Sequence, residues 1–275
     1  MEPEKARKKT PGPGWIWSHL ANQVLLFAVV GGFTVVLKAK AYAVPSSVTW
    51  LGSALLGLVV LLMLYGMVRK SLTYVWWEAV LLLMVYGGIW LSCLAVLPVW
   101  AAVIAAAFLT ALPMFVPLTL ACNSSMVVGA AGVGLLAAIN LPMPVMLICA
   151  AGVAAYEFYR AQGPDLATLL SEAWHAGVVP GLLVPAEPKG WLRDIGAVWQ
   201  PGQGVVAGFL PFVSAAAAGY AAASRGWLTY AVFIVAVVAG TFWFGRGAHG
   251  KMRWWIFPAS SALALAAVWS FYSML

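Results

Sequence analysis

Long runs of hydrophobic residues, separated by short polar breaks, make up most of the chain. A helix that crosses the hydrocarbon core of a bilayer needs about 20 such residues, and the polar breaks leave nine segments of that size. These segments are residues 20–37, 47–68, 73–94, 96–114, 118–139, 142–159, 201–222, 227–245 and 256–274. The pattern therefore predicts an all-α membrane protein, a polytopic bundle of about nine transmembrane helices.

The polar breaks also divide the chain into larger parts. They are a basic tail at 1–19, helices at 20–159, a loop at 160–200 and helices at 201–275. Within the loop, Pro164-Asp165 can begin a helix, because proline suits the first turn and Asp suits the cap. One apolar face follows, at Leu166, Leu169, Leu170, Ala173 and Trp174. We expect a short amphipathic helix there, lying on the cytoplasmic membrane surface or packed on the bundle's own loops.

The composition excludes a soluble protein. Hydrophobic residues form 64% and charged residues 8% of the chain, whereas soluble domains carry roughly 25% charged residues. The lipid bilayer is therefore the expected surrounding. The net charge of +7 reflects basic loops, and no run of Lys and Arg interleaved with aromatic residues indicates a nucleic-acid partner.

The distribution of Lys and Arg predicts the orientation in the membrane. With the N-terminus in the cytoplasm and nine helices, only Lys38, Lys40 and Arg225 fall on the outer side, which leaves twelve of the 15 basic residues inside. We therefore expect a multi-pass protein of the cell membrane, with a cytoplasmic N-terminus and an external C-terminus.

The cysteine and histidine residues predict no cofactor. The cysteines lie in apolar segments without a CxxC spacing, and we interpret them as small core residues: Cys93, Cys122 and Cys149. The histidines fall in predicted flanks or loops, at His19, His175 and His249. Because no two of them are spaced to ligate a metal or haem within the bilayer, we expect no metal site.

Short motifs stand at the ends of three predicted helices. Tyr156-Glu157 ends the sixth helix, Gly202-Gln203-Gly204-Val205 opens the seventh, and Phe257-Pro258-Ala259-Ser260 opens the last. Two further segments, Val44–Val48 and Leu166–Lys189, precede the second helix and follow the sixth. In order, spacing and topology these segments resemble the presenilin and signal peptide peptidase family of intramembrane aspartyl proteases, in its compact prokaryotic form. The resemblance covers nearly the whole chain and implies the family's nine-helix fold.

The family's signatures are Tyr-Asp on the sixth helix, Gly-x-Gly-Asp on the seventh and Pro-Ala-Leu on the ninth. In this chain the resemblance aligns Tyr156-Glu157 with the first signature, so that Glu157 replaces the first aspartate. An ungapped match at the end of that helix places Ala154 there instead. Val205 replaces the second aspartate, and Ser260 stands where the third signature has leucine.

These replacements remove the chemistry that the family uses. Aspartyl proteolysis needs two carboxylates close enough to share a proton, one acting as base and the other as acid. Valine cannot exchange a proton, and glutamate is one methylene longer than aspartate. The only aspartates of the chain, Asp165 and Asp194, lie in the loop. The resemblance therefore implies a pseudoprotease without a working catalytic pair.

In such a protein the former substrate cleft would bind a transmembrane peptide or a membrane-protein partner. The resemblance places Gly202 and Gly204 at this cleft, with Pro258 and Ala259 at its rim. Each also has a purely structural interpretation: small residues allow helices to approach closely, and proline suits the first turn of a helix.

Other interpretations remain open at the sequence level. Glu157 can form an ion pair with Arg160 on the same helix face, and Glu78 suits an interface near the start of the third helix. An active protease that uses Glu157 with a second acid is one alternative function. A channel or transporter is another, suggested by the prolines that interrupt helices four to six: Pro113, Pro117, Pro142 and Pro144. No internal repeat supports the transporter.

Overall fold

The computed structural model describes residues 14–39, 54, 58, 74–94, 96–162, 181–198, 204–247 and 256–273. Apart from two helical positions, the predicted helix at 47–68 lies outside these residues, and so does the predicted amphipathic helix of the loop. The long helices are α1 (Gly14–Ala39), α3 (Tyr74–Leu94), α4 (Val99–Phe115), α5 (Thr119–Asn140), α6 (Met143–Gln162), α9 (Phe209–Arg225), α10 (Trp227–Gly247) and α11 (Ile256–Ser273). Each overlaps a predicted membrane segment, although α1 begins six residues earlier and α9 eight residues later than predicted.

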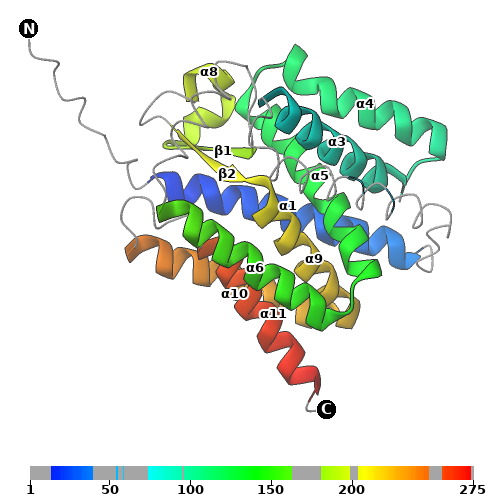
Figure 1. Ribbon diagram of the computed structural model, residues 1–275, viewed down its shortest axis with the longest axis vertical. Coiled ribbons are helices and arrows are strands. Elements are labelled where there is room, and N and C mark those ends of the chain that lie inside the picture. Colours follow the sequence, from blue (N-terminus) through cyan, green and yellow to red (C-terminus); the bar gives the residue numbers. More distant parts are fainter. Residues whose placement is uncertain are drawn as a thin grey trace, which may run out of the picture.

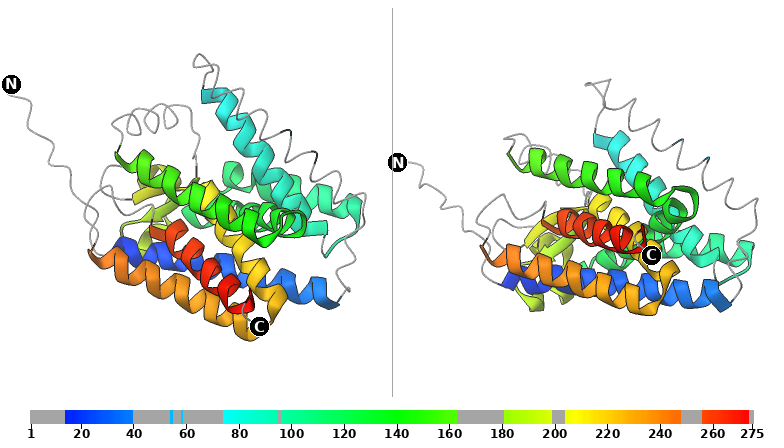
Figure 2. Two further views of the ribbon diagram at one scale, coloured as in Figure 1. Left: turned by 60° about the horizontal axis from the view of Figure 1, so that its bottom comes forward. Right: turned by 90° about the horizontal axis from the view of Figure 1, so that it is seen from below.

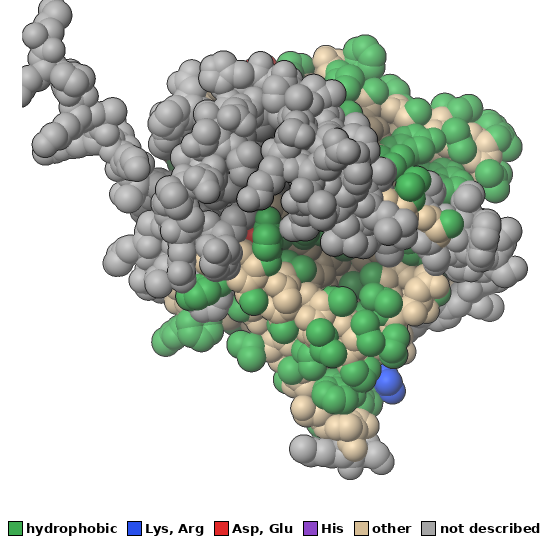
Figure 3. Space-filling model, in the orientation of Figure 1, with side chains coloured by type: hydrophobic (Ala, Val, Ile, Leu, Met, Phe, Trp, Pro, Cys, Tyr) green, Lys and Arg blue, Asp and Glu red, His purple; other side chains and the backbone are tan. Residues whose placement is uncertain are grey.

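Several of these helices suit a lipid bilayer. By length and composition, four in the described part can cross a membrane: Trp15–Leu37, Thr119–Asn140, Trp227–Gly245 and Ile256–Ser273. On the face drawn in Figure 3, the described surface carries mainly hydrophobic and uncharged groups. The chain is therefore a membrane-embedded, multi-pass helical bundle, as predicted, whereas the count of nine spans stays a prediction.

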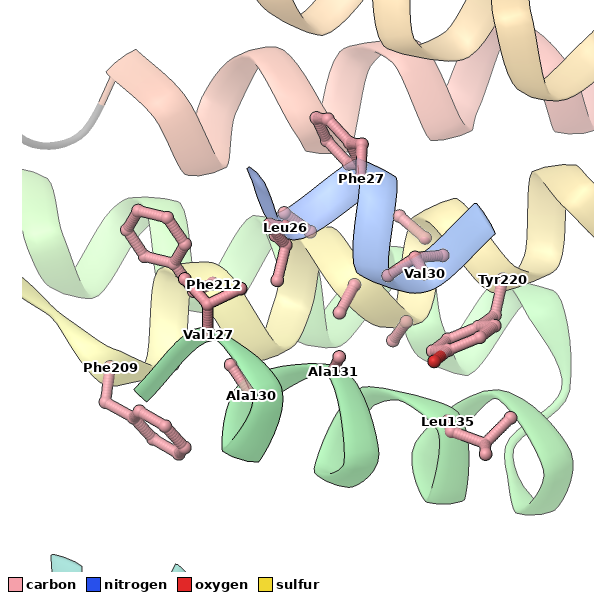
Figure 4. Packing of buried hydrophobic residues seen from close by; sticks show 14 of the residues in the cluster. Leu26, Phe27, Val30, Val127, Ala130, Ala131, Leu135, Phe209, Phe212 and Tyr220 are labelled. Atoms are coloured by element: carbon pink, nitrogen blue, oxygen red, sulfur yellow. The ribbon is translucent and has the colours of Figure 1, made fainter. Parts of the chain in front are cut away.

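Helices α5 and α9 form the centre of the bundle. Helix α5 packs against α1, α3, α4 and α9, while α9 also contacts α6, α10 and α11. Leu26, Val127 and Phe212, from three different helices, meet in the fully buried core between them (Figure 4). Helix α10 lies alongside α1 (Figure 2). The central pair thus positions all the elements that surround the candidate site.

Small residues bring the helix backbones together. A Cβ atom added to Gly132 of α5 would lie 1.8 Å from the carbonyl oxygen of Gly88 in α3. One added to Gly134 would lie 2.6 Å from the Cβ atom of Ala216 in α9. Helices in lipid associate through this close packing because no hydrophobic force acts between them there.

Pro113 is accommodated inside α4 by a hydroxyl group of the neighbouring helix. Proline has no N–H, so the carbonyl group of Leu109, four residues earlier, loses its usual helical donor. The Ser125 hydroxyl of α5 donates to this carbonyl oxygen at 2.7 Å. Side-chain donors of this kind allow proline within membrane helices. The interruption of the fourth helix therefore reflects helix packing.

The segment between α6 and α9 contains a small antiparallel sheet, which lies near the beginning of α1 (Figure 1). Strand β1 (Gly181–Pro185) pairs with β2 (Gly204–Gly208), and η1 (Pro188–Leu192) and α8 (Ile195–Val198) lie between them. The prediction of a helix from residue 201 is therefore wrong for 204–208. The short apolar run after Gly204 suits a strand as well as a helix, and periodicity alone does not distinguish the two.

The predicted surroundings of two side chains, His19 and Cys149, also need correction. Helix α1 begins at Gly14, so that His19 lies inside a helix and is buried, and not in a flank. Among the cysteines, Cys122 is buried and Cys93 half-buried, but Cys149 is exposed on α6. The interpretation as a core residue is therefore wrong for Cys149.

Candidate functional site

The candidate site is built around the β1–β2 sheet. Its register pairs Leu182 with Ala207, Leu183 with Val206, and Pro185 with Gly204. In an antiparallel sheet, hydrogen-bonded pairs alternate with pairs whose backbone groups point away from each other. The hydrogen bonds of Leu183 show which pairs of β1 and β2 bond to each other and which do not.

Leu183 directs its backbone polar groups at a side chain of α5. Its N–H donates to Oδ1 of Asn123 at 2.8 Å, and its carbonyl oxygen accepts from Nδ2 of Asn123 at 2.6 Å. Leu183 and Val206 therefore form a pair without mutual hydrogen bonds. Pro185, which has no N–H, falls in the same class through its pairing with Gly204. The proline thus stands at a position of β1 where no N–H is needed for a bond to β2.

A second amide supports the arrangement from α1. Asn22 accepts a hydrogen bond at Oδ1 from Asn123 at 3.2 Å and donates to the Leu183 carbonyl oxygen at 3.4 Å. The side chains of Asn22 and Asn123 are fully buried. Because an unpaired buried amide costs roughly 1–3 kcal/mol, the network favours the one sheet position that satisfies both side chains.

The chain after β1 is held by the beginning of the same helix. The Thr119 hydroxyl and backbone N–H of α5 both donate to the carbonyl oxygen of Arg193, at 3.2 Å and 3.0 Å. Leu118 forms a β-bridge with Asp194, and Asp194 caps α8 by accepting from the Gly196 N–H at 2.7 Å. Residues 181–198 are thus anchored to the first turns of α5.

Glu157 approaches the sheet from α6. Its side chain is 2% exposed, and a Cβ atom added to Gly208 would lie 2.8 Å from its Oε1 atom. Gly208 is the residue before α9, at the helix N-cap. The N-terminal end of a helix favours a negative charge because its free N–H groups point outward. The carboxyl group of Glu157 is thus buried beside the start of α9. The ion pair between Glu157 and Arg160 stays a prediction, because the Arg160 side chain lies outside the described residues.

The two residues of the first motif, Tyr156 and Glu157, differ in their exposure. Tyr156 is 45% exposed, whereas Glu157 beside it is buried. Ala154, the alternative aligned position, is half-buried. Val205 lies in β2, opposite Val184 and close in sequence to Gly208. Its side chain lies outside the described set, as does that of Glu78. The structure therefore brings the sixth-helix acid to the end of the strand that carries Val205.

Of the predicted cleft residues, Gly204 begins β2 and Gly202 lies outside the described residues. Pro258 is buried and Ala259 is half-buried in the first turn of α11. Beside Pro258, the Phe257 ring lies 4.9 Å from the Phe212 ring of α9 and 5.5 Å from the His19 ring of α1, between ring centroids. The start of α11 thus belongs to an aromatic cluster that joins three helices.

The described carboxyl groups do not form a catalytic pair. Glu157 is the buried one, while Glu187 and Asp194 are exposed. Within the same part of the chain, no group of three or more His, Cys, Asp or Glu residues has a metal-binding arrangement. Among the described residues, the geometry thus offers one buried acid, Glu157, beside a two-stranded sheet.

Sequence reasoning missed the amides that hold the sheet. Asn22 and Gln23 interrupt the apolar run of the first helix, and Asn123 interrupts that of the fifth. Polar side chains within membrane segments are costly and usually have a partner or a function, so this signal was present in the sequence. Gln23 is fully buried, and its Oε1 and Nε2 atoms have no hydrogen-bond partner in the described structure.

Comparison with known proteins gives no further assignment. No protein-family model, no curated protein and no solved structure matches the chain.

Proposed function

We propose that the chain is a presenilin-like pseudoprotease that binds an extended segment of a transmembrane peptide or membrane-protein partner along β2. The observation that carries this proposal is the combination of one buried carboxyl group, Glu157, with a two-stranded sheet beside it. The aligned position of the second acid is Val205, which cannot transfer a proton. The site therefore keeps a means of holding a substrate backbone and lacks the means of cutting it.

The outward direction of backbone groups of β2 supports strand binding. Because Leu183 bonds to Asn123, its partner Val206 directs its N–H and carbonyl groups away from β1. Within the described residues, no third strand pairs with β2. An extended peptide adds to such an edge through main-chain hydrogen bonds, and the edge of β2 ends beside Glu157.

The proposal includes the predicted topology. Nine membrane helices with a cytoplasmic N-terminus would place the sheet on the cytoplasmic side of the cell membrane, where most Lys and Arg residues fall. A partner would then present a membrane helix followed by an extended cytoplasmic segment, and the sheet would bind that segment.

A peptide-binding measurement tests strand addition. The probe is a labelled peptide with about 20 apolar residues and a short Val/Thr-rich cytoplasmic flank, added to the purified protein in lipid nanodiscs. Val206→Pro removes an outward N–H group without removing a β1–β2 hydrogen bond, and we expect about tenfold weaker binding. Val206→Ala keeps the N–H and serves as the control. Equal binding by both variants, with unchanged melting temperatures, would refute strand addition.

The burial of Glu157 favours a second candidate, an intramembrane protease that uses this residue with a second acid. This candidate requires the wild-type protein to cleave the probe and requires Glu157→Gln to abolish cleavage. Cleavage that survives Glu157→Gln would dismiss it, because the amide cannot serve as acid or base.

A further inference from the structure

The buried Asn123 side chain occupies the place of a neighbouring strand. Its amide donates to the Leu183 carbonyl oxygen and accepts from the Leu183 N–H, at 2.6 Å and 2.8 Å. These are the two bonds that an adjacent β-strand would make to this residue. Strand β1 is thus paired on one edge by β2 and on the other by a side chain of the helix bundle.

This contact fixes which backbone groups of the sheet face outward. If the hydrogen-bond alternation shifted by one residue, Leu183 would point at β2 and the fully buried Asn123 amide would lose both of its hydrogen bonds to Leu183. Asn22 opposes the same shift, since it bonds both to Asn123 and to the Leu183 carbonyl oxygen. The alternation of β1 in turn determines that of β2, so that Val206 presents its N–H and carbonyl groups at the outer edge.

We infer that Asn123 is a positioning residue that sets the edge and the register at which a partner strand adds to the sheet. This inference rests on the proposed function, which supplies the partner, an extended peptide segment. Asn123 lies on the far side of β1 from β2 and acts on the partner only through the sheet. A partner strand then meets donors and acceptors at alternate positions of β2, including Val206 but not Val205.

The first test measures the sheet itself, in the full-length protein in nanodiscs. Asn123→Leu keeps a similar side-chain size and removes both hydrogen bonds to Leu183, together with the one to Asn22, so the amide hydrogen of Leu183 should exchange about tenfold faster. The amides of Leu182 and Val184 should keep their protection because they bond to β2. Asn123→Asp retains an acceptor for the Leu183 N–H and should restore part of the protection. Asn140→Leu, on the same helix, is the control, since among the described residues Asn140 bonds to the Leu136 carbonyl oxygen of its own helix, at 2.8 Å, and not to the sheet.

The second test measures register with the same labelled transmembrane peptide. N-methylation at single positions of its flank removes one N–H at a time. With the wild-type protein, binding should fall about tenfold for methylation at alternate positions and stay unchanged between them. With Asn123→Leu, this alternation should disappear, while Asn140→Leu should keep it.

The outcomes separate the inference from the proposed function. Unchanged Leu183 exchange in Asn123→Leu, or an alternation that persists in that variant, would overturn the role of Asn123. Faster exchange of Leu183 alone, combined with no binding of the peptide to the wild-type protein, would support Asn123 as the residue that fixes the sheet and would refute strand binding. Faster exchange at Leu182 and Val184 as well would show a general loss of structure and would contradict a specific role.

Discussion

Glu157 fits against α9 because residue 208 has no side chain. The sequence alone indicates an acid near the end of the sixth helix, and the structure confirms that Glu157 belongs to α6. Its neighbour was not predictable, because Gly208 lies far along the chain from Glu157. The buried amides Asn22 and Asn123 show the same limit: their polarity is visible in the sequence, but their shared partner, Leu183, is not.

The contact between Glu157 and Gly208 predicts a measurable coupling. In Gly208→Ala the new Cβ atom would lie 2.8 Å from Oε1, so the carboxyl group must move, and we expect a loss of about 1–2 kcal/mol in unfolding free energy. The double variant with Glu157→Ala should recover part of this loss, because the clash is gone. Gly152→Ala on α6 is the control, with no atom within 4 Å of its new Cβ atom. Strictly additive losses in denaturant unfolding would contradict the contact.

Among the elements, helix α5 makes more of the hydrogen bonds that hold the site than its apolar sequence suggests. Thr119, Asn123 and Ser125 bond to the loop segment, to the sheet and to α4, respectively. The hydrophobic pattern predicted the helix and its approximate ends, since a long apolar segment in a membrane must satisfy its own backbone hydrogen bonds and therefore forms a helix. It did not predict β2, because five residues are too few to show a period and the pairing strand comes from elsewhere in the chain.

The bond from Ser125 to α4 predicts a dependence on Pro113. In Ser125→Ala the Leu109 carbonyl oxygen loses its donor, and we expect a loss of about 1 kcal/mol in unfolding free energy. Pro113→Ala restores a helical N–H four residues after Leu109. The loss from Ser125→Ala should therefore be smaller in a Pro113→Ala background, as measured by unfolding in detergent. A loss of the same size in both backgrounds would argue against the bond.

For the whole molecule, the bilayer explains the exposed surface. Large apolar side chains such as Trp100, Phe115 and Trp243 are exposed, and lipid is the surrounding that removes them from water. Composition was sufficient to predict this class of protein. Orientation, the number of spans and the presenilin-like relationship rest on the sequence pattern alone and stay predictions.

Accessibility labelling in cells tests the orientation. In a variant without the native cysteines, Ser273→Cys near the C-terminus should react with a membrane-impermeant maleimide in intact cells. Glu187→Cys in the loop after α6 should react only after permeabilisation, because the positive-inside distribution places that loop in the cytoplasm. Both positions are exposed in the protein. The reverse labelling pattern would show that the protein has the opposite orientation. Labelling of both sites in intact cells would refute an odd number of membrane spans between residues 187 and 273.

The most direct measurement is cleavage of the labelled transmembrane peptide by the purified protein in lipid, with binding recorded in the same samples. Wild-type protein and Glu157→Gln should bind the peptide and cleave it no faster than heat-inactivated protein. The variant with Val205→Asp and Glu157→Asp tests whether two aspartates restore hydrolysis. Cleavage by the wild-type protein that disappears in Glu157→Gln would contradict the account and would identify Glu157 as half of a working catalytic pair.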